Sequence, residues 1–161
     1  MASSILPNEA IASPLLLRGD KVWQQASDIP AVMPGSNTAV VTVYTTSAPD
    51  ECTNDGTATA NRTWKTGLTN WIPPSFGATY QLKVYAASTG LANAQSSGTQ
   101  LFETGSGNED QWYFDYQSGI LHFIGDNLPS DIGTGTSNTI FVAGAVYVGN
   151  TGVTSTGSNM V

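Results

Sequence analysis

Charged side chains are scarce in this chain. Asp, Glu, Lys and Arg together make up 11% of its 161 residues, less than half of the roughly 25% that is usual for soluble domains. Glycine, serine, threonine and asparagine take their place, and these residues favour turns and strands over helices. A chain with so little charge often has much of its surface covered by partners, although low-charge extracellular β proteins also exist.

Basic residues are the scarcest of the charged types. Five Lys and Arg stand against twelve Asp and Glu, which gives a net charge of −7. Binding to a phosphate backbone requires a basic patch, so this balance argues against a nucleic-acid partner. Binding to an anionic membrane surface is disfavoured for the same reason. The negative charge does keep a protein surface soluble and self-repelling.

The chain has one cysteine, Cys52, and one histidine, His122. A single cysteine cannot form an internal disulfide, and these two residues are too few for a Cys/His zinc site. Cys52 lies in a polar run and is interpreted as a loop or strand-end thiol, which fits folding in a reducing cytoplasm. His122 alternates with apolar neighbours, so we expect a surface or cross-strand histidine.

Long apolar runs are also lacking. No run approaches the roughly 20 residues that a membrane-spanning helix needs, so no membrane insertion is expected. The first residues, Met1 to Glu9, contain no basic region followed by an apolar stretch. The sequence therefore predicts no secretory signal.

Residues 1–37 are predicted to form an extended N-terminal arm. Four prolines, at positions 7, 14, 30 and 34, prevent a long helix and interrupt sheet ladders. The alternative is an irregular segment that packs on its own domain. In the arm interpretation, the isolated apolar side chains are candidate assembly contacts, each suited to its own pocket on a partner: Ile5, Leu6, Ile11, Leu15, Leu16, Leu17 and Trp23.

Residues 38–148 are predicted to form the folded domain, and residues 149–161 a C-terminal tail. No window has helical periodicity, whereas short β-rich runs alternate with turn signals. This pattern predicts an all-β fold, an antiparallel β-sandwich or jelly-roll-like domain. The expected strands are residues 38–46, 63–66, 68–72, 79–86, 99–104, 112–116, 120–124 and 139–148.

Three of these strands carry detailed expectations. Residues 112–124 should form a hairpin with Gly119 at positive φ, with Trp112, Phe114 and Tyr116 on one face. Residues 79–86 alternate like a half-buried strand. Residues 139–148 are apolar on both faces, which predicts a central strand or one buried against a neighbouring chain. That apolar strand predicts an oligomer.

No segment carries a convincing set of catalytic residues, and we predict no enzyme, no cofactor and no metal. Asp115 and His122 could approach each other across the hairpin, but no Gly-x-Ser-x-Gly motif accompanies them. The acidic pairs 50–51 and 109–110 and the acids near Asp126 are interpreted as solvated turns. Calcium binding by residues 108–110 or 126–127 is a weaker alternative, since they lack EF-hand spacing.

The aromatic residues offer the clearest alternative to a purely structural role. Sugar-binding proteins stack sugar rings on exposed aromatic side chains. Trp64, Trp71 and Tyr113 are therefore candidate surface-recognition aromatics. The competing interpretation is that the tryptophans anchor the core, because aromatic residues supply much of the burial in β-sandwiches.

A resemblance extends over about half of the chain, roughly residues 64–150. It comprises Trp71–Tyr85, then the pattern Trp-x-Phe-Asp-Tyr-x-x-Gly-x-Leu-x-Phe over Trp112–Phe123, then Ile140–Gly149. This order resembles a module in virion structural proteins of tailed bacteriophages, particularly tail-fibre-type proteins of phages from aquatic bacteria. The resemblance implies particle assembly, often as trimers, and brings no catalytic residue with it.

The sequence therefore leads to a specific functional expectation. We expect a non-enzymatic virion protein, made in the host cytoplasm, that serves in the tail fibre or its attachment region. Its partners would be itself, as a homotrimer, and other virion proteins. One alternative is a capsid decoration protein that stabilises the head. The other is a carbohydrate-binding module that recognises a host-surface glycan.

Overall fold

The computed structural model describes residues 22–57, 59–90, 93–103, 112–124, 130–132 and 137–152. The chain divides into two compact units. One unit is Pro30–Val148. The other combines residues up to Ile29 with those from Gly149 onward. Each unit is described by itself.

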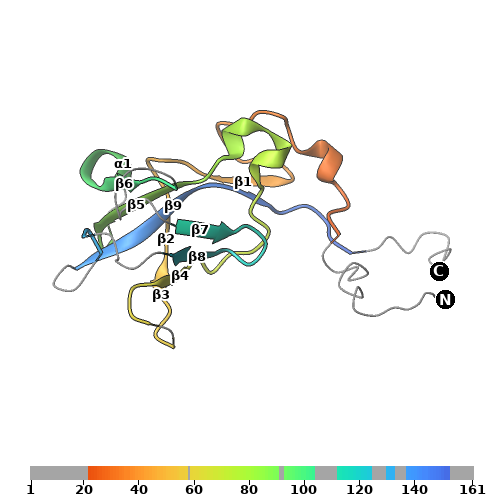
Figure 1. Cartoon of the computed structure of the whole chain (residues 1–161). Helices are drawn as coiled ribbons and strands as arrows, with labels where there is room; N and C mark the ends of the chain where they lie inside the picture. Colours follow the sequence, from red (N-terminus) through yellow and green to blue (C-terminus); the bar gives the residue numbers. More distant parts are fainter. Residues whose placement is uncertain are drawn as a thin grey trace, which may run out of the picture. The chain divides into compact units, whose positions relative to one another are not determined.

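The first sheet of the larger unit is built around a long strand, β9 (Asn138–Tyr147). On one path the strand order is β1 (Val41–Tyr44), β9, β5 (Lys83–Ser88) and β6 (Thr99–Leu101). The short strand β2 (Asp50–Glu51) also pairs with β9. Every pairing is antiparallel, and Figure 1 shows β9 as the long strand of this sheet.

The second sheet has the strand order β3 (Thr53–Asn54), β4 (Thr63–Lys65), β8 (Ile120–Phe123) and β7 (Trp112–Asp115). Its pairings are antiparallel as well. A core cluster contains residues from strands of both sheets, including Val84, Ile140, Phe114 and Leu121. This arrangement confirms the predicted all-β, sandwich-like class.

The chain passes from the first sheet to the second at Cys52. Its N–H donates to the carbonyl of Ile140 at 2.8 Å, and its own carbonyl accepts from the Thr139 hydroxyl at 3.3 Å. The Cys52 side chain is buried in the main core. The sequence predicted a loop in this region, so β2 and β3 were missed. Two-residue strands depend on the partner strand, and their own sequence carries no alternation.

The hairpin of β7 and β8 forms as predicted. Trp112 lies opposite Phe123, and Phe114 lies opposite Leu121, with all four side chains buried. Gly119 has a φ of 71°. The Asp115 carboxylate accepts from the N–H groups of residues 117 and 118, which closes the turn. The expected faces are confirmed, because Tyr113 is exposed while its neighbours in β7 are buried.

Trp71 lies at the centre of the aromatic core, with 1% of its surface exposed. Its ring meets Phe114 edge to face at a centroid distance of 5.7 Å, and Phe114 meets Tyr116 in the same way at 5.1 Å. Such pairs contribute about 0.5–1.5 kcal/mol each beyond their buried area. The indole N–H of Trp71 donates to the Thr66 hydroxyl at 3.2 Å. The ring lies directly against Gly144.

Strand β9 is buried on both faces by the chain itself. Ile140, Val142 and Val146 belong to the main core. On the other face, Phe141 and Ala143 pack with Tyr85, Ala87 and Ala94. The last of these residues belongs to a short helix, α1 (Ala94–Ser97), in a segment where the sequence predicted only loop. The central position of β9 is confirmed, and its burial needs no second chain.

The same cluster corrects the expectation for β5. The sequence predicted a strand buried on one face only, but Val84 and Ala86 point into the main core while Tyr85 and Ala87 lie under α1. The strand also begins later than expected. Residues 78–80 form a 3-10 helix, η5 (Ala78–Tyr80), directly after another, η4 (Pro74–Phe76).

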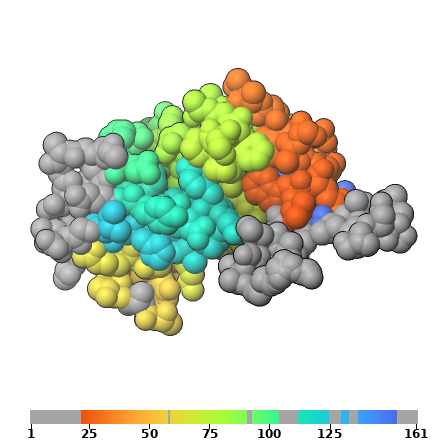
Figure 2. All heavy atoms as spheres, turned by 45° about the vertical axis from the view of Figure 1, so that its right-hand side comes forward, coloured from red at the N-terminus to blue at the C-terminus, as the bar shows by residue number. Residues whose placement is uncertain are grey.

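Residues 30–37, which were predicted to belong to the arm, are hydrogen bonded to the β domain. The Tyr80 hydroxyl donates to the Pro30 carbonyl at 2.6 Å, and the Met33 N–H donates to the Thr79 hydroxyl at 2.7 Å. In Figure 2 this segment (orange) lies against the region of η4 and η5 (yellow-green). The Asn37 side chain accepts from the N–H of Val43 at 2.8 Å, so it protects the edge of β1 from pairing with other strands.

The described part of the smaller unit contains a short ladder between residues 22–25 and residues 150–152. Trp23 bridges to Thr151, and the N–H of Gln24 donates to the carbonyl of Asn150 at 2.9 Å. A 3-10 helix, η3 (Ala26–Asp28), follows. The beginning of the predicted tail is therefore paired. Of the candidate assembly contacts, Trp23 lies in this ladder, and the other six lie outside the described residues: Ile5, Leu6, Ile11, Leu15, Leu16 and Leu17.

Replacing Gly119 with alanine should destabilise the domain by at least about 2 kcal/mol. A Cβ at this position would lie 1.8 Å from the carbonyl oxygen of Leu68, and the φ of 71° strains any side chain. Urea denaturation measures the loss. Gly56→Ala is the matched control, because Gly56 has open space around it and no left-handed φ. Equal stability of the two variants would contradict this role of Gly119.

Candidate functional site

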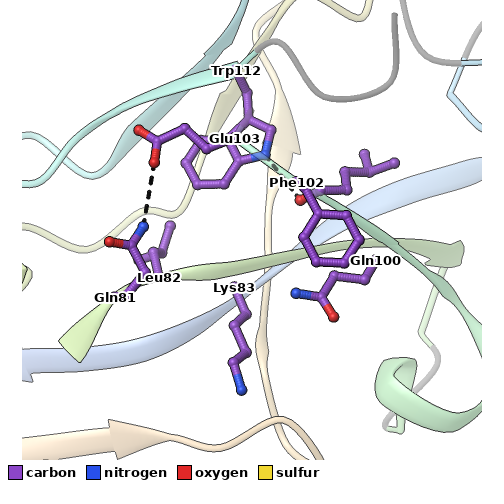
Figure 3. A pocket seen from close by; sticks show the side chains of 8 residues that line it. Gln81, Leu82, Lys83, Gln100, Phe102, Glu103 and Trp112 are labelled. Atoms are coloured by element: carbon purple, nitrogen blue, oxygen red, sulfur yellow. Dashed lines mark hydrogen bonds between the residues drawn. The ribbon is translucent and has the colours of Figure 1, made fainter. Parts of the chain in front are cut away.

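A hollow of about 260 Å³ opens beside the β5–β6 pair (Figure 3). It is formed by one segment at the start of β5, one that includes and follows β6, and the first residue of β7. Its lining residues are Gln81, Leu82, Lys83, Gln100, Leu101, Phe102, Glu103 and Trp112.

The floor of the hollow is part of the domain core. Leu82, Leu101 and Trp112 are all buried and belong to the main core cluster. The indole N–H of Trp112 donates to the carbonyl of Leu101 at 2.9 Å, which joins the second sheet to the end of β6. Side chains held by packing and by a buried hydrogen bond give the hollow a preformed shape.

The rim of the hollow is polar, apart from one aromatic ring. Phe102 is 54% exposed. The amide nitrogen of Gln81 donates to the Glu103 carboxylate at 3.5 Å, and Figure 3 shows these two side chains pointing toward each other. Lys83 points away from this pair in the same view. The rim therefore presents an apolar ring, amide groups and one charge of each sign.

Of the three aromatics that were predicted to serve in surface recognition, two are buried and one is exposed. Trp64 and Trp71 are only 4% and 1% exposed, so neither can stack on a ligand, and this part of the prediction is wrong. Trp64 faces inward because it pairs with Leu121 in the core, and its indole N–H already donates to the carbonyl of Asn61. Tyr113 is 57% exposed on the outer face of the second sheet.

Phe102 was given no role from the sequence, although a signal for it was present. Residues 99–104 were expected to form a strand, and successive side chains of a strand point to opposite faces. Leu101 and Phe102 therefore could not both enter the same core. The structure buries Leu101 and exposes Phe102.

The residues that could have served in catalysis are engaged in structural contacts. His122 lies opposite Thr63, and its Nδ1 is 3.2 Å from the threonine hydroxyl, which confirms the cross-strand interpretation. Asp115 caps the hairpin turn. Residues 108–110 and 126–127 lie outside the described residues. Within the described ranges, no group of three or more His, Cys, Asp or Glu residues is placed to hold a metal ion.

The carboxyl group of Asp50 is the most perturbed acid among the described residues. One of its oxygens is buried without a hydrogen-bond partner. Burial and the neighbouring Glu51 carboxylate raise the pKa of Asp50 to about 6. Burial, and to a smaller extent the charges of the same two acids, raise the pKa of the Cys52 thiol. A thiol held protonated in the core is a poor nucleophile.

Comparison with known proteins leaves the resemblance as an interpretation of the sequence. No family model, no curated protein and no solved structure matches this chain. Among the residues that the structure describes, none of the helices has the length and apolar character of a membrane span.

Asp50 should make the domain less stable as pH rises from about 4 to 7. Its pKa is higher in the folded chain, at about 6, than the ordinary value of 3.8. The folded state therefore holds the proton more tightly, and this stabilisation is complete below pH 3.8 and lost as pH rises through 6. Asp50→Asn should flatten the dependence of the free energy of unfolding on pH, measured by urea denaturation at several pH values.

The matched variant for this test is Glu51→Gln. It removes the Glu51 charge, which raises the pKa of Asp50 in addition to burial. The pH dependence of the free energy of unfolding should therefore become weaker without disappearing. An unchanged profile in Asp50→Asn would show that other groups control stability in this range.

Proposed function

We propose that this chain is a non-enzymatic structural protein of a tailed-phage virion, a β-rich subunit of the tail fibre or its attachment region. The proposal combines the sequence resemblance with two features of the structure. The first is the structural role of the residues that carry the resemblance. The second is the pairing of residues 22–25 with residues 150–152.

Every specified residue of the hairpin pattern packs in the core, contacts a core residue or shapes the turn. Trp112, Phe114, Leu121 and Phe123 are buried in the core. Asp115 closes the turn through hydrogen bonds to main-chain N–H groups. Tyr116 stacks edge to face on Phe114, and Gly119 approaches the Leu68 carbonyl more closely than any side chain would allow. The pattern thus specifies the packing of the hairpin, which fits a structural module.

The ladder between residues 22–25 and residues 150–152 is the observation that carries the proposal. The N–H of Gln24 donates to the Asn150 carbonyl, and the N–H of Gly152 donates to the Val22 carbonyl, both at 2.9 Å. The side-chain oxygen of Gln25 accepts from the N–H of Asn150 at 2.8 Å. This ladder gathers the first and the last described residues into one unit. Such pairing would suit a subunit that is attached through the segments next to this ladder.

The trimer rests on the resemblance, since β9 is covered by its own chain. Contact surfaces are nevertheless available on the described residues. The large apolar side chains that remain exposed are Val22, Val32, Phe102, Tyr113, Ile124 and Val148. Burying such side chains against other subunits would stabilise an assembly, because each removes apolar area from water.

Light scattering on the full chain at micromolar concentration should give three times the monomer mass. A stable, soluble monomer under these conditions would count against the homotrimer. It would leave attachment to other virion proteins as the remaining mode of assembly.

Deleting residues 1–29 should leave the β domain folded and prevent incorporation into the particle. The domain begins at Pro30, so the deletion removes the terminal ladder and spares the contacts to Thr79 and Tyr80. Circular dichroism measures folding, and immunoblotting of purified particles measures incorporation. Deletion of 1–34 is the comparison, and it should destabilise the domain because it removes the Pro30 carbonyl that accepts from Tyr80 and the Met33 N–H that donates to Thr79.

Immunogold labelling with antibodies to the full chain locates the subunit on intact particles. Label on the tail fibre or its attachment region supports the proposed position, and label over the head supports the decoration protein. If the chain lacking residues 1–29 is still incorporated normally, the β domain itself makes the attachment. If no particle carries the label, the virion assignment fails.

A further inference from the structure

The chain leaves the first sheet through residues 45–52, which we call the crossing segment. Strand β1 ends opposite Gly144 of β9, and β2 begins opposite Val142. Residues 45–49 therefore stand against a single residue of β9, so the edge of this sheet is interrupted. Beyond β2 the chain continues to β3 of the second sheet (Figure 1). The ladder that joins the crossing segment to β9 is only the two residues of β2 long.

Individual hydrogen bonds, rather than a long ladder, hold the crossing segment in place. The Thr46 hydroxyl donates to the side-chain oxygen of Gln95 at 2.7 Å. The Glu51 carboxylate accepts from the N–H of Gly90 at 3.3 Å. Both of these bonds are exposed, and only the bonds of Cys52 to β9 lie in the core. Segments with a short ladder and exposed hydrogen bonds can open without global unfolding.

Asp50 places a carboxyl group on the inner face of this segment. Its partner Val142 belongs to the main core, and paired residues of an antiparallel ladder share a face. One oxygen of the carboxyl group is buried without a hydrogen-bond partner. The ionisable groups around it are all acids: the Tyr44 phenol, the Glu51 carboxyl and the Cys52 thiol. The neighbouring strands β9 and β3 contain no Asp, Glu, Lys, Arg or His.

The closed segment therefore accommodates one protonation state of Asp50 better than the other. A protonated carboxyl group is neutral and can stay buried, whereas a carboxylate would lose hydration and gain no partner. We propose that the crossing segment is a pH-sensitive switch, closed in weak acid and opened more often at neutral pH. Opening releases β2 and uncovers the Cys52 thiol, while the β7–β8 hairpin stays folded.

The closed form binds the Asp50 proton more tightly than the open form does. The pKa of this carboxyl group is about 6 in the closed chain and 3.8 when it is exposed. Opening is therefore rarest below pH 3.8 and increases until the pH passes 6. Each pKa unit corresponds to about a tenfold change in the opening equilibrium. Because Asp50 is partly exposed, solvent screening reduces the effect, and we expect an increase of at least about tenfold.

The single cysteine of the chain reports this opening. Cys52 is 4% exposed in the closed form, so a thiol reagent reaches it only after opening. The test is the rate of labelling by dithiodipyridine, which reacts with thiols in weak acid, in the unaltered chain and in Asp50→Asn. The ratio of the two rates should rise at least about tenfold between pH 4 and pH 7. Taking the ratio at each pH removes the intrinsic effect of pH on thiol reactivity.

Glu103→Gln is the matched control, because it removes an exposed carboxylate outside the crossing segment. This variant should be labelled like the unaltered chain at both pH values. Glu51→Gln keeps a hydrogen-bond acceptor for Gly90 and removes one of the causes that raise the pKa of Asp50. Its labelling should still increase with pH, but less steeply than that of the unaltered chain.

Urea separates local opening from global unfolding. Global unfolding exposes much more surface, so labelling through it would rise steeply with urea, whereas labelling through the crossing segment should barely change at low urea. Hydrogen exchange in the unaltered chain is a second measurement that needs no variant. At pH 7 the N–H of Cys52 should be less protected than the N–H of Phe123, which donates to the Arg62 carbonyl in the second sheet.

Three results would overturn the proposal: a labelling ratio that does not change with pH, labelling that follows global unfolding in urea, or equal protection of the two N–H groups. All of these measurements use the full chain in solution. The switch is therefore judged independently of the virion assignment.

Discussion

The two sheets are joined through a three-residue segment centred on Trp71. The Trp71 N–H donates to the carbonyl of Tyr116, which lies beside the second sheet. Trp71 also forms a β-bridge with Val146 of β9 in the first sheet. The neighbouring N–H of Ile72 donates to the Ala145 carbonyl. The indole then fills the space between the sheets, against Phe114 and Gly144. These hydrogen bonds and the buried ring together fix the spacing between the two sheets.

The position of the hollow beside β5 and β6 follows from this packing. The inward residues Leu82 and Leu101 end the core beside β6, and Trp112 of the second sheet closes it from the other side. Where the core ends, the polar residues that flank Leu82 and the aromatic that follows Leu101 reach the surface. The hollow thus has a floor of buried core residues and a rim of exposed residues.

Local patterns allowed several elements to be predicted. The β7–β8 hairpin followed from alternation on either side of a glycine, and β9 from an uninterrupted apolar run; both are confirmed. The strands β2 and β3 could not be found in this way, because two residues show no period and their pairing depends on β9 and β4. The helix α1 is a single turn that covers Tyr85 and Phe141, and only the packed sheet creates that apolar surface.

The sequence by itself determined the β class, the hairpin turn at Gly119 and the central strand, because these depend on neighbours in the chain and on conformational freedom. Only the tertiary structure decided which aromatics are accessible. Trp64, Trp71, Phe102 and Tyr113 all lie in short β-rich runs, and their types do not distinguish them. The strand register and the contact between sheets bury the first two and expose the others. The exposure of a side chain depends on how segments distant in the sequence pair with each other. Composition and local periodicity therefore cannot predict it.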